Sequence, residues 1–224
     1  MIPLNLEPFI FDCEVFAYDW LFVFKNKVTG EYTEIWNDNE AVEQFMTQEP
    51  LLAGFNNKHY DQFILKAVLS GFTPEEIKAV NDFIIVGGHE GWEYTPLRDC
   101  GIFFDQYDLM DDCQMGLSLK AIEAHLGMDI RETTVPFNID RPLTEDEKQE
   151  VEFYCRHDVD ATDRLDDLRQ GYLSSKLTLG REKGLYPAKA LYMTNAKLTA
   201  AYLDAEQKPH YDEREYQYPP KLLR

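Results

Sequence analysis

The sequence predicts an α/β fold, in which helices cover both faces of a sheet. Strand-like segments come first in the chain, helical and strand-like segments then alternate, and a long helical region follows. The chain has 224 residues, of which 44% are hydrophobic and 13% aromatic. This size and composition can form the core of one large domain, or of one domain with an extension.

The first part of the chain predicts most of the sheet. Residues 8–36 contain three strand-like segments, FIFDCEVF, WLFVFKN and EYTEIWN, and Gly30 marks the second turn of this meander. DNEAVEQFMTQ predicts a short helix, and PLLAGFN predicts a fourth strand. The next segment, NKHYDQFILKAVLSGF, has apolar residues at helical spacing, and Gly71 marks the end of that helix.

The middle of the chain predicts a loop, a fifth strand and a helix. GGHEGWEYTP is typical of a loop, and GIFFDQYDL predicts the strand. In SLKAIEAHLG, Ser118 is expected to cap the start of a helix and Gly127 its end. Thr144 and Glu147 have the spacing of a capping box, which predicts the start of a long helix.

The chain is expected to divide into a main domain, residues 1–173, and an extension, residues 174–224. Within the extension, YPAKALYMTNAKLTAAYLDA predicts a helix. The final segment, EQKPHYDEREYQYPPKLLR, is polar and interrupted by proline, which is typical of a linker or tail.

The charge and cysteine content limit the classes of function. The net charge is −19, from 22 basic and 41 acidic residues, which argues against broad electrostatic binding of a nucleic-acid backbone. A protein that binds only a few nucleotides through divalent cations remains compatible with this charge. The cysteines are scattered, which predicts buried reduced thiols: Cys13, Cys100, Cys113 and Cys155. Because the sequence has neither a secretory signal nor an apolar run of ~18 residues, we expect a cytoplasmic protein without membrane contact.

Two acidic residues interrupt the first predicted strand. Asp12 and Glu14 lie in EPFIFDCEVFAYDWLFVF, and their spacing directs both side chains to one face of a strand. Buried carboxylates are costly without a cation, and paired oxygen ligands suit Mg²⁺ or Mn²⁺. D-x-E also occurs elsewhere in this acidic chain, so the pattern alone leaves both a metal site and chance open.

Two further pairs have a four-residue spacing. Asn57 and Asp61 lie where a helix is expected to follow a strand, and Tyr154 and Asp158 lie in the late helix. Residues four apart share one face of a helix. Each pair alone also has a structural explanation, such as a helix cap, a first-turn acid or a half-buried aromatic.

Taken in order, D-x-E, N-x-x-x-D and Y-x-x-x-D resemble the DEDD superfamily of 3′–5′ exonucleases over roughly residues 7–172. Phe153 stands where the histidine-type branch has its histidine, so the resemblance is to the tyrosine-type branch. The segments SLKAIEAHLG, YCRHDVDAT and TNAKLTAAYLDA also resemble the proofreading domain of bacteriophage DNA polymerases. The resemblance implies a ribonuclease H-like mixed sheet.

The resemblance also implies a site with two divalent ions, Mg²⁺ or Mn²⁺, about 4 Å apart. Asp12, Glu14 and Asp158 would hold the first ion. Asp12 would also contact the second ion, which Asp61 supports directly or through water. Tyr154 would orient the attacking water, because a phenol is a poor base at neutral pH.

Two further residues are expected either to contact the nucleic acid or to have a structural role near the site. Asn57 is expected to contact the substrate backbone or to order the end of the strand. Phe16 is expected to stack on the terminal base or to pack in the core.

The expected function is the removal of nucleotides from single-stranded or frayed DNA 3′ ends, as the proofreading domain or subunit of a phage-type DNA polymerase. If the chain is phage-encoded, it would work in the host cytoplasm. Two alternatives remain open: a free-standing 3′–5′ exonuclease that processes RNA, and an inactive exonuclease-like docking module. None of these motifs distinguishes DNA from RNA by its sugar.

Overall fold

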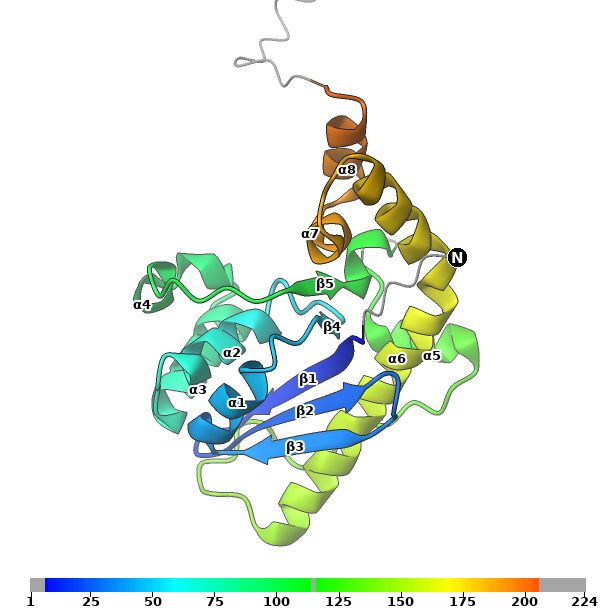
Figure 1. Ribbon diagram of the computed structural model, residues 1–224. Helices are drawn as coiled ribbons and strands as arrows, with labels where there is room; N and C mark the ends of the chain where they lie inside the picture. Colours follow the sequence, from blue (N-terminus) through cyan, green and yellow to red (C-terminus); the bar gives the residue numbers. More distant parts are fainter. Residues whose placement is uncertain (1–6, 114–115, 206–224) are drawn as a thin grey trace, which may run out of the picture.

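The fold is α/β, with a five-stranded mixed sheet in the order β3-β2-β1-β4-β5 and helices on both faces (Figure 1). The computed structural model describes residues 7–113 and 116–205. The prediction of an α/β fold with helices on both faces is therefore confirmed. The polar segment predicted for residues 206–224 lies outside the described residues.

The sheet has an antiparallel part and a parallel part, and β1 belongs to both. β1 pairs with β2 and β2 with β3 in antiparallel fashion, whereas β1, β4 and β5 run parallel. The meander predicted for residues 8–36 is confirmed, and Gly30 has a φ of 74° in its second turn. The strands are β1 (Phe9–Val15), β2 (Trp20–Asn26), β3 (Tyr32–Trp36), β4 (Leu52–Gly54) and β5 (Gln106–Asp108).

The helices connect and cover these strands. Ser118 caps α5 and Gly127 ends it, and Thr144 and Glu147 form a capping box at the start of α6, as predicted. The α-helices are α1 (Asn39–Met46), α2 (Asp61–Leu69), α3 (Pro74–Ile85), α4 (Thr95–Arg98), α5 (Leu119–Leu126), α6 (Glu145–Glu182), α7 (Pro187–Tyr192) and α8 (Asn195–Tyr202). The short 3₁₀ helices are η1 (Gly91–Glu93) and η2 (Leu109–Asp112).

The alternation of β1 divides the core between the two faces of the sheet. Phe11, Cys13 and Val15 pack with apolar residues of α1, α2 and α3. Ile10 and Phe16 belong to the second core, which includes the apolar side of α6. Hence the intervening polar residues of β1 face α6.

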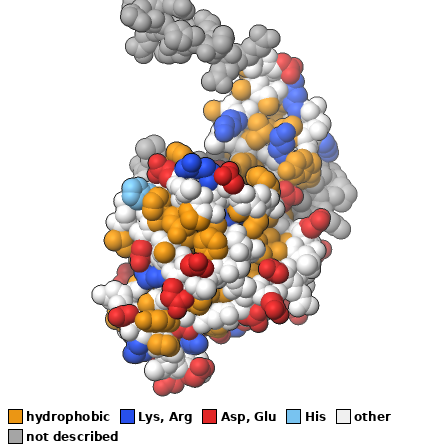
Figure 2. All heavy atoms as spheres, turned by 90° about the vertical axis from the view of Figure 1, so that its left-hand side faces the viewer, with side chains coloured by type: hydrophobic (Ala, Val, Ile, Leu, Met, Phe, Trp, Pro, Cys, Tyr) orange, Lys and Arg blue, Asp and Glu red, His pale blue; other side chains and the backbone are white. Residues whose placement is uncertain are grey.

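The face that carries α1 to α4 has hydrophobic side chains gathered on its surface (Figure 2). Val86 and Trp92 follow α3 and are 78% and 62% exposed. This apolar surface lies on the side of the sheet away from α6.

Three predicted elements differ in extent from those observed. Only Gln106–Asp108 of the predicted fifth strand pairs with the sheet. The helix predicted within residues 186–205 is two helices, because Thr194 caps a new one, α8. The longest helix, α6, continues past residue 173 to Glu182, across the expected domain boundary.

Two α-helices, α3 and α4, were not predicted from the sequence, and the segment expected to be a loop, GGHEGWEYTP, contains η1 and the start of α4. The start of α3 has clear signals. Thr73 and Glu76 form a capping box, and Pro74 occupies the first turn.

Among the residues that the structure describes, no helix combines the length and the apolar character that a membrane span requires.

A network of lysines and aspartates holds α6 on the sheet. Lys25 of β2 and Lys27, which directly follows β2, pair with aspartates of α6. Asp166 is fully buried, lies 3.0 Å from the Lys27 ammonium and accepts a hydrogen bond of 2.8 Å from the Tyr107 hydroxyl. These contacts fix the position of α6 across β1 and β2.

Replacing Asp166 by alanine is expected to lower the free energy of unfolding by about 1–3 kcal/mol, because the buried Tyr107 hydroxyl loses its acceptor and Lys27 loses the most buried of its partners. Asp167 contacts the same ammonium at 2.8 Å, but its side chain is 52% exposed. Asp167→Ala is therefore the matched control, with an expected cost below about 1 kcal/mol. Urea denaturation measures both, and equal losses would contradict a special role for the buried pair.

Candidate metal and catalytic site

Asp12 and Glu14 point from β1 toward α6, as the strand spacing predicts. Asp12 is half-buried, and Glu14 is 8% exposed. The flanking residues of β1 belong to the core on the other face of the sheet. The strand therefore presents two sheltered carboxylates side by side.

The late helix brings a third carboxylate and a thiol to this strand. Asp158 is 8% exposed on α6, which packs against β1. Cys155 lies one turn earlier, and its sulfur is 3.7 Å from Asp12 Oδ2. The sulfur of Cys155 and carboxylate oxygens of Asp12 and Glu14 all lie within 4.8 Å of one another.

The Cys155 thiol is a hydrogen-bond donor in this group. Burial, followed by the charges of Asp12 and Glu14, raises the pKa of Cys155. The sulfur is therefore protonated at neutral pH, when it makes a poor metal ligand. All four cysteines of the chain are free; Cys13 and Cys155 are buried, as predicted, and the other two are half-buried.

Asp61 adds a fourth carboxylate from the first turn of α2. It is 4% exposed and accepts a hydrogen bond of 3.1 Å from the Cys13 thiol. The charge of Asp61 also acts on Asp12 and Glu14. Three separate elements thus place four carboxylates within electrostatic reach of one another, whereas Asp61 and Asp158 lie outside the described group whose ligand atoms are all within 4.8 Å.

Asn57 does not share a helix face with Asp61, contrary to the prediction. The helix begins at Asp61, and Asn57 lies in the turn before it, where a four-residue spacing does not align side chains. Asn57 is fully buried and packs closely against Gly54. A Cβ added to Gly54 would lie only 2.8 Å from the Cβ of Asn57. Its side chain has no exposed surface in this structure, a position that agrees with the expectation that it orders the strand end.

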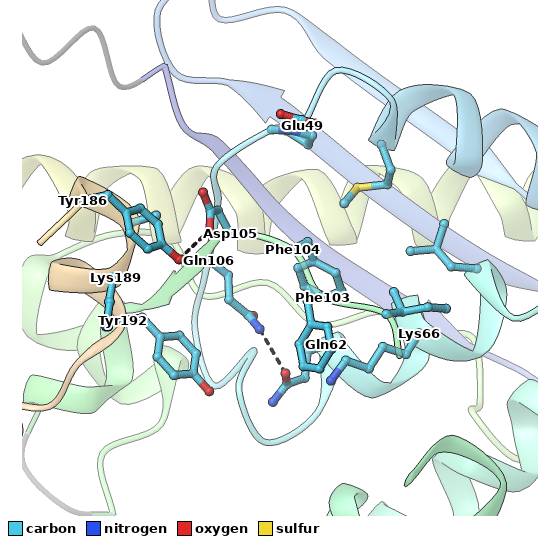
Figure 3. Close-up of a pocket in the computed structure, with 15 residues that line it drawn as sticks. Glu49, Gln62, Lys66, Phe103, Phe104, Asp105, Gln106, Tyr186, Lys189 and Tyr192 are labelled. Carbon is cyan, nitrogen blue, oxygen red and sulfur yellow. Dashed lines mark hydrogen bonds between the residues drawn. The ribbon is translucent and has the colours of Figure 1, made fainter. Parts of the chain in front are cut away.

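Asn57, Gln106 and Gln62 contact one another, in that order, through their side-chain amides. The Asn57 amide lies 2.8 Å from the amide of Gln106. The Gln106 amide in turn donates a hydrogen bond of 2.9 Å to Gln62 (Figure 3). Both glutamines line a cavity of about 650 Å³ between β5, α2 and α7. The four carboxylates do not line this cavity, so it is separate from their site.

Phe16 packs in the core rather than presenting a free ring. It is 1% exposed and stacks on Phe137, with ring centroids 5.2 Å apart. Phe137 is 46% exposed. Of the two expectations for Phe16, core packing describes its position, and the accessible ring at this place is that of Phe137.

Burial and mutual repulsion make the carboxylates hard to ionise together. Burial, followed by the charges of Asp61, Glu14 and Asp158, raises the pKa of Asp12 well above its usual value. The pKa of Glu14 is raised by burial and then by Asp158 and Asp61, and is lowered by Lys120. Burial also raises the pKa of Asp61 to about 6. Without a cation, the site therefore keeps protons at a pH where separate, exposed carboxyl groups would have lost them.

Lys120 is a functional candidate that the sequence did not reveal. It extends from α5, donates a hydrogen bond to Asp158 Oδ1 and lies 4.8 Å from the centroid of the Tyr154 ring. Its single charge offsets only part of the charge of four carboxylates. The only sequence signal was its place in a predicted helix, because the contact depends on how α5 packs against α6.

Without divalent ions, the protein is expected to lose stability as pH rises from about 4 to about 6. Folded Asp61 keeps its proton until about pH 6, whereas its ordinary pKa is 3.8, so the folded state binds more protons between these values. Asp61 alone would account for up to about 3 kcal/mol. Urea denaturation between pH 4 and 7 measures the slope, and Asp61→Asn should flatten it. An unchanged slope in the variant would contradict the expectation.

No protein-family model, curated protein or solved structure matches this chain.

Proposed function

We propose that the protein is a metal-dependent 3′–5′ exonuclease that removes nucleotides from single-stranded or frayed DNA 3′ ends. The observation that supports this most is that Asp61 of α2 and Asp158 of α6 lie near enough to act by their charge on the Asp12 and Glu14 pair of β1, with Tyr154 one helical turn before Asp158. These residues are the motif set that resembles the tyrosine-type DEDD exonucleases. We also propose that the mixed sheet is ribonuclease H-like.

The residues present fit two divalent cations. Their donor atoms are carboxylate oxygens, which suit Mg²⁺ or Mn²⁺. The pKa values of Asp12 and Glu14 are raised by burial and by neighbouring negative charges, and bound cations would lower them again. Asp12, Glu14 and Asp158 would hold one ion, and Asp12 with Asp61 would hold the other. When bound, such ions neutralise phosphate charge and lower the pKa of bound water.

Tyr154 is proposed to orient the attacking water. Burial, followed by the charge of Asp158, raises the pKa of its phenol far above the ordinary value. The phenol therefore keeps its proton at neutral pH and can donate a hydrogen bond, but it cannot serve as the base. Its ring is held from one side by the Lys120 ammonium.

The proposed substrate is a short stretch of DNA near the 3′ end. A net charge of −19 disfavours long electrostatic contacts, so binding should depend on the ions and a few local groups. The exposed ring of Phe137 is a candidate platform for a base, beside the buried Phe16. The place of this activity in a phage-type DNA polymerase, as a domain or subunit, is supported by the sequence resemblance.

The test is nucleotide release from 3′-labelled single strands of DNA and matched RNA, with Mg²⁺ or Mn²⁺ and with a chelator. We expect release of mononucleotides from the 3′ end of DNA only with the divalent ion. Faster release from RNA would favour the RNA-processing alternative. No release from either strand would contradict the proposed activity and favour the inactive docking module.

A further inference from the structure

Glu123 is a buried carboxylate whose oxygens have no hydrogen-bond partner among the described residues. It lies on α5, is 1% exposed, and neither Oε1 nor Oε2 accepts a hydrogen bond. The nearest basic side chains are Lys120, with its ammonium 3.6 Å from Oε1, and His157, with its ring Nε2 3.8 Å from the same oxygen. Because leaving a buried carboxylate without hydrogen bonds is costly, this position requires an explanation.

Lys120 lies between Glu123 and the proposed metal site. It is three residues before Glu123, so both side chains lie on one side of α5. Its ammonium donates to Asp158 Oδ1 but only approaches Glu123. The hydrogen bond is thus made to Asp158, while Glu123 has only the longer-range ion pair.

An ion at the proposed site would compete with this lysine. Asp158 is one of the carboxylates proposed to bind the cation, and the ammonium already occupies its Oδ1. A divalent ion and an ammonium on the same carboxylate would repel each other. Glu123 is close enough to accept the displaced ammonium through side-chain rotation alone, since the two groups are already at ion-pair distance.

We infer that Lys120 is a built-in counter-ion that exchanges between two carboxylates, Asp158 without metal and Glu123 with metal bound. In this inference, which rests on the proposed function, Glu123 is a positioning residue that acts through Lys120. The exchange explains why a carboxylate without hydrogen bonds is kept buried beside the site. It also keeps the ammonium near Tyr154 in both states.

The experiment is a double-mutant cycle on Mn²⁺ affinity, measured on the full chain from the electron paramagnetic resonance signal of free Mn²⁺. Glu123→Gln should weaken binding about tenfold, because the ammonium then has no alternative partner. Lys120→Met should tighten binding about tenfold, because it removes the competitor. In the Lys120→Met background, Glu123→Gln should have no effect.

The background dependence separates this exchange from other roles of Glu123. If Glu123→Gln weakens binding equally with and without Lys120, Glu123 acts directly through its charge and the exchange is wrong. No effect in either background also overturns it. If the wild type binds Mn²⁺ but the effect of Glu123→Gln does not depend on Lys120, the proposed function stands and only the exchange is wrong. If the wild type binds no Mn²⁺, both the proposed function and the exchange are wrong.

Two controls protect the cycle from trivial explanations. Glu132→Gln makes the same charge change at an exposed position and should leave Mn²⁺ affinity unchanged. If Lys120→Met does not fold, as judged by its melting curve, Lys120→Gln takes its place in the cycle. The prediction for Glu123→Gln is the same in that background.

Discussion

Replacing Asp12 by asparagine is expected to reduce nucleotide release from a 3′-labelled DNA strand by ~1,000-fold. Asp12 is the carboxylate on which the charges of Glu14, Asp61 and Asp158 all act, so an ion held by the group requires it. Asparagine keeps the size of the side chain and removes the charge. The measurement is single-turnover release at saturating Mg²⁺.

The same variant should fold at least as well as the wild type without metal. Removing one of several mutually repelling buried charges relieves electrostatic strain. Asp38→Asn is the control, because Asp38 belongs to another D-x-E pair but serves as the exposed cap of α1. Activity that survives Asp12→Asn with an intact fold would contradict the proposed site.

Saturating Mn²⁺ is expected to raise the melting temperature by about 5–10 °C. An ion at about 100 times its dissociation constant stabilises the folded state by about 2.7 kcal/mol, and 1 kcal/mol shifts the midpoint by about 2–4 °C at this chain length. The physical reason is that the cation relieves the repulsion that raises the pKa of Asp12 and Glu14. Differential scanning calorimetry with and without a chelator measures the shift.

The expected shift depends on the carboxylates and on pH. It should largely disappear in Asp12→Asn. It should also decrease below pH 6, where Asp61 gains a proton and protons compete with the metal for this side chain. An equal shift in the variant would show that the ion binds elsewhere.

The parts of the fold that follow from local periodicity could be predicted from the sequence. The two-residue period placed Asp12 and Glu14 on the face of β1 opposite Phe11 and Cys13, and the capping box at Thr144 marked the start of α6. These features depend on neighbouring residues alone.

What the sequence could not show depends on contacts between distant segments. The contact of Lys120 with Asp158 requires the packing of α5 on α6, and the burial of Asn57 requires its approach to Gly54 and Gln106. Phe137, whose ring stacks on that of Phe16, lies in a segment without regular secondary structure. No spacing rule connects such residues.

The helix α6 is continuous from the carboxylate site to the C-terminal helices. The helix carries Asp158 beside β1 and continues to Glu182, about 36 Å further along its axis, where α7 and α8 pack against it. Between these two ends, ion pairs of Lys25 and Lys27 with aspartates of α6 hold the helix to the sheet. α7 also packs against β5, so the far part of α6 is joined to the sheet a second time. One continuous helix thus joins the segment that α7 and α8 cover to the segment that carries Asp158.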